Sequence, residues 1–163
     1  MAAVDPVASE QIRALKYRYL RTLDLRKWDE FGDTLTADAQ ADYGSPSGGE
    51  PLSFRGRDKI VEYMSGAITG TMITSHVCTH PEITVDGDNA SGSWCLEDTV
   101  IVPEYGVMIR GAAYYHDTYR READGAWRIA STGYQRTYEA MIPLASIEGF
   151  TLTSSMWDPS VGH

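Results

Sequence analysis

Residues 74–100, TSHVCTHPEITVDGDNASGSWCLEDTV, decide the fold, because they read as two β-strands joined by a tight turn at Asp86-Gly87-Asp88. Val, Ile, Thr and Trp are frequent on both sides of the turn, as expected for a β-hairpin. Histidine, cysteine and acidic residues nevertheless stand at strand positions where a plain hairpin carries apolar side chains. The hairpin therefore supplies the first residues to consider for a functional site.

The sequence after the hairpin has the same character. Two further segments are rich in Thr, Val, Ile, Tyr and Trp, and the turn sequences PEYG and EADG precede them. Successive strands of this kind predict an antiparallel meander, and strands of this length favour curvature or bulges. The strands are expected at 72–85, 89–102, 107–122 and 126–138.

Helical patterns come before the meander. Apolar residues recur there at spacings of three and four, which is typical of amphipathic helices. Helices followed by a meander predict an α+β domain in which the helices cover one face of a curved sheet and leave an apolar pocket. Helices are expected at 7–24, at 27–35 and from Asp58, with short strands at 39–43 and 52–56 around a turn-rich loop at 44–51.

The composition limits the classes of partner. The chain has 163 residues with 14 basic and 23 acidic ones, a formal net charge of −9. Such a charge repels phosphate backbones and anionic lipid, so we expect neither nucleic acid nor membrane as a partner. The apolar runs are too short to cross a bilayer. Without a signal-like N-terminus, and with two cysteines that make no disulfide framework, the protein is expected in the cytoplasm.

The last segment differs from the rest of the chain. Residues 143–163 are apolar but are interrupted by Pro143, Gly149 and Pro159. Exposed together, their apolar side chains would form a large patch. We therefore expect one domain over residues 1–142 and a tail that covers the pocket mouth or packs on a neighbouring subunit.

Strand alternation brings a histidine and a carboxylate together. A three-residue turn would place His76 directly opposite Asp98 and would put Trp94 and Leu96 on the pocket side. A turn with an even number of residues would place Thr99 there instead. An imidazole beside a carboxylate can act as a general base, although a hydrogen-bonded core histidine has the same pattern.

Other polar residues could join this pair. Tyr19 lies on the inward stripe of the first helix, and Asp24 stands at its end. In the last strand Arg136 is expected to share a face with Tyr134 and Tyr138, where it could clamp an anion or a carbonyl group. Tyr115 and His116 belong to the YYHD segment at 114–117, and the alternation does not fix which side of the strand His116 takes.

The sequence contains no pattern typical of a metal site or of a cofactor-binding loop. His76 and His80 are four residues apart on a strand, roughly 13 Å, and cannot share one ion. Cys78 has no neighbouring motif that would lower its pKa. The glycine-containing stretches match no phosphate-binding loop. Neither a metal nor a cofactor is expected.

Four segments together resemble a known family. YLRTLDLRKWDEF at 19–31, FRGRDKIVEYM at 54–64, SHVCTHPEITVDGDNASG at 75–92 and YYHDTYRREADGAWRIASTGYQR at 114–136 resemble the SnoaL-like branch of the nuclear transport factor two-like superfamily. The resemblance covers roughly residues 5–142 and implies a cone-shaped α+β barrel around an apolar pocket, without a metal and often as a trimer. The branch includes scytalone dehydratase, bile acid 7α-dehydratase and hexachlorocyclohexane dehydrochlorinase.

The resemblance also implies a site. Dehydratase members use a His–Asp dyad, a tyrosine and an aspartate from the first helix, and an arginine from the last strand. The catalytic residues then fall on His76, Asp98, Tyr19, Asp24 and Arg136. Substrate contacts are expected from Trp94, Leu96, His80, Tyr134, Tyr115 and His116. His80 departs from the family pattern, because relatives often carry Asn there, and the site pattern of ketosteroid isomerase is not reproduced.

The function implied is that of a cofactor-independent lyase. The His–Asp dyad would carry out a dehydratase-type elimination on an apolar, ring-containing, hydroxylated small molecule. Two alternatives stay open: a steroid- or polyketide-type isomerase or cyclase with the same base, and a small-molecule-binding module without catalysis. A homo-oligomer, a dimer or a trimer, is expected.

Overall fold

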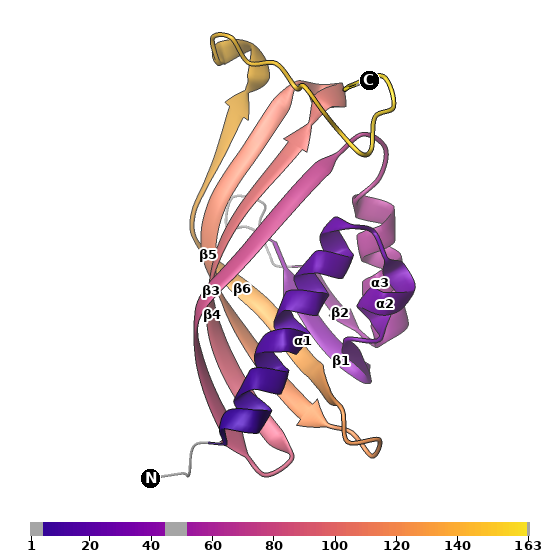
Figure 1. Ribbon diagram of the computed structural model, residues 1–163, viewed down its shortest axis with the longest axis vertical. Helices are drawn as coiled ribbons and strands as arrows, with labels where there is room; N and C mark the ends of the chain where they lie inside the picture. Colours follow the sequence, from indigo (N-terminus) through magenta and orange to yellow (C-terminus); the bar gives the residue numbers. More distant parts are fainter. Residues whose placement is uncertain (1–4, 45–51, 163) are drawn as a thin grey trace.

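A strongly curved six-stranded sheet forms the body of the protein, and three helices cover its concave face (Figure 1). The computed structural model describes residues 5–44 and 52–162. The predicted α+β fold, a cone of mixed and mainly antiparallel strands with three helices, is confirmed. The elements are α1 (Pro6–Asp24), α2 (Trp28–Gly32), β1 (Leu35–Tyr43), β2 (Leu52–Arg55), α3 (Arg57–Ala67), β3 (Ile73–Asp86), β4 (Asn89–Val102), β5 (Val107–Arg121) and β6 (Trp127–Pro143).

The sheet order is β2-β1-β6-β5-β4-β3. β1 runs parallel to β6, and every other neighbouring pair is antiparallel. The four long strands form the predicted meander, and the short strands β1 and β2 extend it beyond β6. Of the predicted loop at 44–51, residues 45–51 lie outside the part of the chain that the structure describes.

The first helix begins close to where the sequence predicts. Oδ1 of Asp5 accepts hydrogen bonds from the backbone N–H groups of Val7 at 3.1 Å and Ala8 at 2.9 Å, and Pro6 occupies the first turn. Such a cap satisfies amide groups that have no partner inside the helix. Within residues 5–44 and 52–162, no helix is both long and apolar enough to cross a membrane.

The β3–β4 hairpin does not have the predicted turn. The turn holds two residues rather than three, because Asp86 pairs with Asn89. By itself, an even turn would direct Asp98 away from the side of the sheet that His76 occupies. The three-residue turn of the prediction is therefore wrong.

A β-bulge in β3 restores the predicted pairing. At His80 and Pro81, two residues of β3 lie opposite a single residue of β4. His80 has a φ of +50°, which histidine adopts more readily than most residues, and Pro81 has no N–H to donate to the neighbouring strand. The bulge shifts the register by one residue, so His76 lies opposite Asp98, as predicted.

A second bulge, at Thr137 in β6, decides which side chains of the last strand point inward. Arg136 pairs with Ala113 but Tyr138 pairs with Ala112, so one residue of β6 is left between them. The Arg136 side chain is 9% exposed, whereas Tyr138 is 53% exposed. The predicted shared face of Arg136 and Tyr138 is wrong, because the bulge reverses the alternation.

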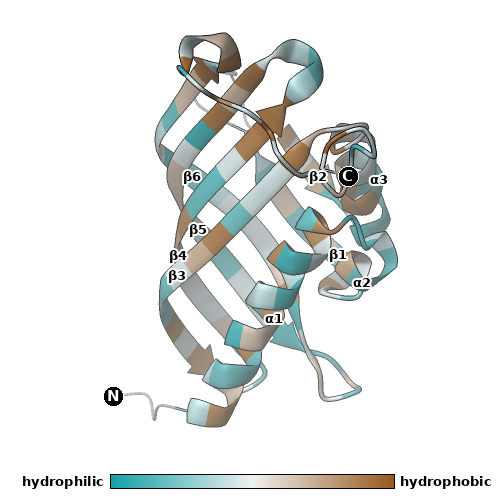
Figure 2. Ribbon diagram, turned by 45° about the horizontal axis from the view of Figure 1, so that its top comes forward, coloured by the Kyte–Doolittle hydropathy of each residue, from teal (hydrophilic) through white to brown (hydrophobic). Residues whose placement is uncertain are grey.

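The core between α1 and the concave face of the sheet encloses a buried ion pair. Polar and apolar residues alternate along α1 in Figure 2, and its buried stripe includes Ile12 and Leu15. Lys16 lies on the same stripe, and its Nζ is 2.7 Å from Oδ2 of Asp117 in β5, both side chains being fully buried. The ammonium also lies 3.4 Å from the centroid of the Tyr115 ring. The Lys16 ammonium therefore makes a cation–π contact with the ring of Tyr115 while it pairs with Asp117.

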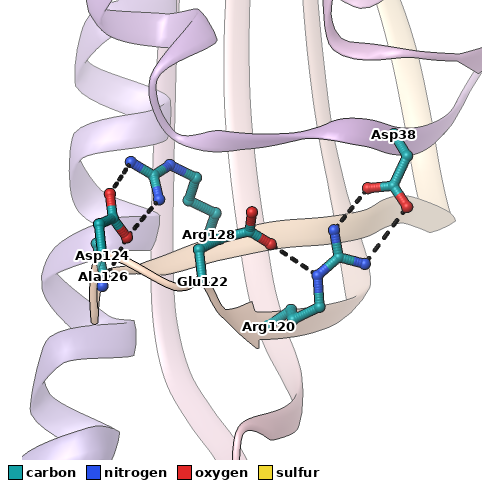
Figure 3. A network of polar contacts seen from close by, with 6 residues as sticks. All are labelled: Asp38, Arg120, Glu122, Asp124, Ala126 and Arg128. Carbon is teal, nitrogen blue, oxygen red and sulfur yellow. Dashed lines mark hydrogen bonds and ion pairs between the residues drawn. The ribbon is translucent and has the colours of Figure 1, made fainter.

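Surface ion pairs hold the end of the sheet near the β5–β6 turn (Figure 3). Arg120 donates two hydrogen bonds to Asp38 of β1 and one to Glu122, and Arg128 donates two to Asp124. The hydrogen bonds from Arg120 lower the pKa of Asp38 to about 2. Because these groups are exposed or partly exposed, they contribute little to stability and mainly hold β1 beside the hairpin.

The segment after β6 turns back across the end of the sheet, toward the loop between α3 and β3 (Figure 1). The ring of Trp157 lies 4.0 Å from Cζ of Arg26. Arg26 in turn donates hydrogen bonds to the carbonyl oxygens of Thr69, Gly70 and Met72. The C-terminal segment therefore contacts the residue that holds this loop in place.

We predict that the buried ion pair tolerates the loss of both charges better than the loss of one. The Lys16→Met variant should lower the free energy of unfolding by about 3–5 kcal/mol, because it leaves the Asp117 carboxylate buried without its cation. The Lys16→Met/Asp117→Asn double variant should recover most of that loss. Urea unfolding of the three proteins checks this. Equal stabilities of the single and double variants would contradict it.

Candidate functional site

A cavity of about 300 Å³ lies between the helices and the concave face of the sheet. Most of its wall is apolar or aromatic, and an imidazole, a carboxylate and a guanidinium, those of His76, Asp98 and Arg136, reach it from β3, β4 and β6. Such a lining, apolar with a few convergent polar groups, is typical of a small-molecule site. The other lining residues are Leu23, Tyr43, Gly44, Tyr63, Met64, Ala67, Ile68, Met72, Thr74, Val100, Tyr115 and Tyr134.

The hydrogen-bond partner of the His76 ring is Asp24. Nδ1 of His76 lies 2.6 Å from Oδ1 of Asp24, at the end of α1. The same carboxylate accepts a hydrogen bond from the His76 backbone N–H at 2.9 Å through Oδ2 and one from the Thr74 hydroxyl at 2.8 Å through Oδ1. Because a carboxylate only accepts, Nδ1 carries the proton and Nε2 is left as the basic nitrogen.

Asp98 does not make the predicted dyad with His76, although the two residues are opposite each other in the sheet. Both carboxylate oxygens of Asp98 accept hydrogen bonds from Arg136, and the bond from Nη2 to Oδ2 is 2.9 Å long. A bidentate arginine is the stronger partner for a carboxylate that is 5% exposed. The prediction that Asp98 orients the ring is therefore corrected: Asp24 orients it.

The packing of Arg136 depends on a glycine and on the bulge at Thr137. A Cβ atom at Gly111, the partner of Asp98 in β5, would lie 2.5 Å from Nη1 of Arg136. The bulge also turns Glu139 inward, where its Oε2 lies 3.3 Å from Nε of Arg136. Burial opposes the charge of Arg136, but the hydrogen bonds to Asp98 offset this and raise the pKa of Arg136. The arginine is therefore fixed and charged.

Tyr19 reaches the cavity only through a second tyrosine. Its hydroxyl lies 2.7 Å from that of Tyr43, and Tyr43 lines the cavity whereas Tyr19 is fully buried behind it. Burial raises the pKa of both phenols. They therefore stay protonated at neutral pH and can act as neutral hydrogen-bond donors.

Two of the six predicted substrate-contact residues line the cavity, Tyr115 and Tyr134. Trp94 and Leu96 are on the predicted side of the sheet, but they are buried in the core, and Trp94 lies against Tyr17 of α1. The prediction that these two residues contact a ligand is corrected, since α1 covers them.

The two remaining predicted contacts are also outside the cavity. His80 is exposed at the bulge, where its Nδ1 lies 2.8 Å from the Thr79 hydroxyl. His116 is exposed because the strand alternation that buries Tyr115 and Asp117 turns it to the opposite side. Neither histidine can reach a ligand in the cavity, and both predictions are corrected.

Several cavity residues escaped the sequence reasoning, notably Tyr43, Tyr63 and Thr74. Thr74 could have been found, because it stands two residues before His76 and so shares its face of the strand. Tyr43 ends the predicted strand at 39–43, but no pattern indicates that the end of this strand reaches the site. Tyr63 lies on the expected apolar side of α3 and has no polar neighbour in sequence that would mark it.

Other reactive groups near the site have structural settings. Burial raises the pKa of the Cys78 thiol to about 12, so the sulfur stays protonated and is a poor nucleophile. Over residues 5–44 and 52–162, no three His, Cys, Asp or Glu side chains converge as a metal site would require.

The geometry thus assembles three chemical functions around one apolar cavity. An imidazole fixed by a carboxylate can accept a proton, a protonated phenol can donate a hydrogen bond, and an arginine can stabilise developing negative charge. These are the parts needed for proton abstraction followed by loss of a leaving group or by proton return. None of these steps requires electron transfer.

Solved structures with the same fold extend this description. A candidate scytalone dehydratase from Novosphingobium aromaticivorans superimposes with a TM-score of 0.72 at 20% identity, over 82% of this chain and 87% of that one. A hexachlorocyclohexane dehydrochlorinase, LinA type 2, gives 0.71 at 19% identity over 83% and 89%. A protein of unknown function from Mycobacterium tuberculosis gives 0.68 at 23% identity over 96% and 88%. At these identities the likeness is one of fold.

The sequence itself decides the family. The model of the SnoaL-like domain matches residues 7–133, which include α1, the hairpin β3–β4, β5 and the first part of β6. Asp24, His76 and Asp98 all lie within the matched segment, and Arg136 follows it closely. The chain therefore belongs to the SnoaL-like domain family.

Proposed function

We propose that the protein is a cofactor-independent lyase that eliminates water from a neutral, ring-containing small molecule. The observation that carries this proposal is the Asp24–His76 pair at the wall of an apolar cavity, with the 2.6 Å contact between Nδ1 and Oδ1. The carboxylate fixes the ring so that Nε2 is the basic nitrogen. The unprotonated Nε2 is the atom that would accept the proton.

In the proposed reaction one proton moves from a substrate carbon to His76 and then to the departing hydroxide. Nε2 of His76 removes a proton from the carbon next to the one that bears the hydroxyl group. The electrons of the broken C–H bond form the new double bond as the C–O bond breaks, and the departing hydroxide takes the proton from the imidazolium and leaves as water. His76 is then neutral again, so the cycle needs no co-reactant.

Arg136 and Tyr43 would stabilise the charge that develops during this step. Arg136 retains N–H groups beyond those that bind Asp98, and the protonated hydroxyl of Tyr43 can donate to a substrate oxygen. Tyr19 would act through its hydrogen bond to Tyr43. In this scheme Asp24 orients the base, and Asp98 positions Arg136.

The charges around the cavity favour a neutral substrate. The positive charge of Arg136 is already matched by Asp98 and faces Glu139 at 3.3 Å. A carboxylate or phosphate on the substrate would therefore meet the Asp98 carboxylate and an arginine whose charge is already matched. The cavity volume of about 300 Å³ and its tyrosine-rich wall suit a compact ring system.

The names of two structural relatives support the reaction class. Dehydratase and dehydrochlorinase are both names for enzymes that eliminate a small group from a carbon skeleton, and the two proteins share the fold at a TM-score above 0.7. The same base could serve an isomerase or a cyclase if no group departs, and a binding module would need no base. Turnover of a hydroxylated substrate to its dehydrated product decides among them.

We also propose that residues 143–163 cover the mouth of the cavity. Trp157 stacks on Arg26, and Arg26 holds the loop that carries Met72. Met72 lines the cavity, as does Ile68 at the end of α3. The stack therefore connects the tail to one side of the cavity wall.

The first prediction for this function concerns His76. In a screen of neutral cyclic hydroxyketones for loss of water, the His76→Ala variant should lose about 100-fold or more of the turnover, because the base is gone. The His116→Ala variant removes an exposed histidine outside the cavity and should stay within about twofold of the parent protein. Equal turnover by the two variants would remove His76 from the mechanism.

The second prediction identifies the carboxylate that orients the ring. Asp24→Asn removes the charge that stabilises the imidazolium, so the midpoint of the His76 ring titration, followed by NMR, should fall by about one pH unit. Asp98→Asn should shift it by less than half as much, because Asp98 binds Arg136. A larger shift from Asp98→Asn would restore the His76–Asp98 dyad.

The third prediction concerns the tail. Trp157→Ala should raise KM by about 3- to 10-fold with a smaller change in kcat, since it removes the cation–π contact with Arg26. Met156→Ala is the control, because this neighbouring side chain is 70% exposed. Light scattering shows whether the tail serves a subunit interface instead. A change in oligomeric state in Trp157→Ala would contradict the proposal that the tail covers the cavity mouth.

A further inference from the structure

One oxygen of Asp24 is shared by two donors. Oδ1 accepts from Nδ1 of His76 at 2.6 Å and from the hydroxyl of Thr74 at 2.8 Å, while Oδ2 accepts from the His76 backbone N–H. Thr74 is 9% exposed and shares the inward face of β3 with His76. The hydroxyl therefore lies at the hydrogen bond that orients the imidazole.

We propose that Thr74 is a positioning residue that sets the proton affinity of His76 through Asp24. Each hydrogen bond to a carboxylate disperses part of its negative charge. The Thr74 hydroxyl takes a share of the charge on Oδ1, so Oδ1 holds the imidazolium proton less tightly. A base that must give its proton back to a leaving group benefits from this weaker hold.

The other ionisable groups around His76 either have partners of their own or stay neutral, so they do not set the proton affinity of the ring. Asp98 of β4 faces the ring in the sheet but is bound by Arg136 of β6. Arg21 of α1 lines a separate groove that Asp24 and His76 also border. Its side chain is 53% exposed and lies 3.9 Å from Glu30.

The remaining neighbours are protonated and neutral. Cys78, the next inward residue of β3, has its pKa raised to about 12 by burial. Burial also raises the pKa of Tyr115 of β5. Both groups therefore stay neutral at neutral pH, and neither adds a charge beside the His76 ring.

An isosteric substitution tests the inference without a substrate. Thr74→Val removes the hydroxyl and keeps the shape, so the midpoint of the His76 ring titration should rise by about one pH unit. Thr74→Ser keeps a hydroxyl and should restore the parent midpoint. Thr132→Val is the matched control, since Thr132 is 2% exposed and its hydroxyl has no hydrogen-bond partner in residues 5–44 and 52–162. An unchanged or lowered midpoint in Thr74→Val would overturn the proposal.

The kinetic consequence of the inference rests on the proposed function. Because His76 must be neutral to accept a proton, a higher midpoint means a smaller active fraction at any pH near or below that midpoint. The acid limb of the kcat/KM profile of Thr74→Val should move up by the same interval as the ring titration, and the rate should recover at higher pH. A rate that is reduced equally at every pH would indicate structural damage and overturn the proposed role. Absence of any turnover in the parent protein would remove the proposed function, while the ring titration would still decide the role of Thr74.

Discussion

The Asp24 carboxylate is the interaction on which the site depends. It stands at the end of α1 and accepts hydrogen bonds from two residues of β3, His76 and Thr74, through three donor groups. These bonds join the first helix to the edge strand of the sheet at the wall of the cavity. Because one of them comes from the His76 backbone and another from its ring, the carboxylate fixes both the strand and the imidazole. A charged acceptor in a partly buried place makes such bonds strong.

The second constraint is the position of the β-bulges. The bulge at His80 and Pro81 compensates for the two-residue turn of the hairpin, and without it Asp98 would face the outer side of the sheet. Arg136 points inward by regular alternation with Tyr134, and the bulge at Thr137 then turns Tyr138 outward. Both bulges lie in long strands, where they also increase the curvature that closes the sheet around the cavity. The same irregularities therefore shape the cone and select the side chains that line it.

The sequence was sufficient for the fold because its signals are local. Helical spacing identified α1 and α3, and turn residues between β-rich segments identified the meander. It also indicated His76, Asp24 and Arg136 as site residues, but it assigned the wrong partner to the imidazole. Whether Asp24 or Asp98 binds the imidazole depends on how α1 crosses the sheet and on the hydrogen bonds between Arg136 and Asp98. Neither of these is a local property of the sequence. The exposure of His80 and the inward turn of Glu139 each depend on a β-bulge. The proline at 81 was a usable sign of the bulge in β3. Nothing in the sequence around Thr137 marks the bulge in β6.

The central claim is that Asp24 holds the His76 ring with Nδ1 protonated and Nε2 free to accept a proton. The most direct test is ¹⁵N NMR of the imidazole nitrogens of the intact protein at a pH where the ring is neutral. We predict the tautomer with the proton on Nδ1, and a strongly deshielded proton there that disappears in Asp24→Asn. A neutral ring protonated on Nε2, unaffected by the loss of the Asp24 charge, would contradict it.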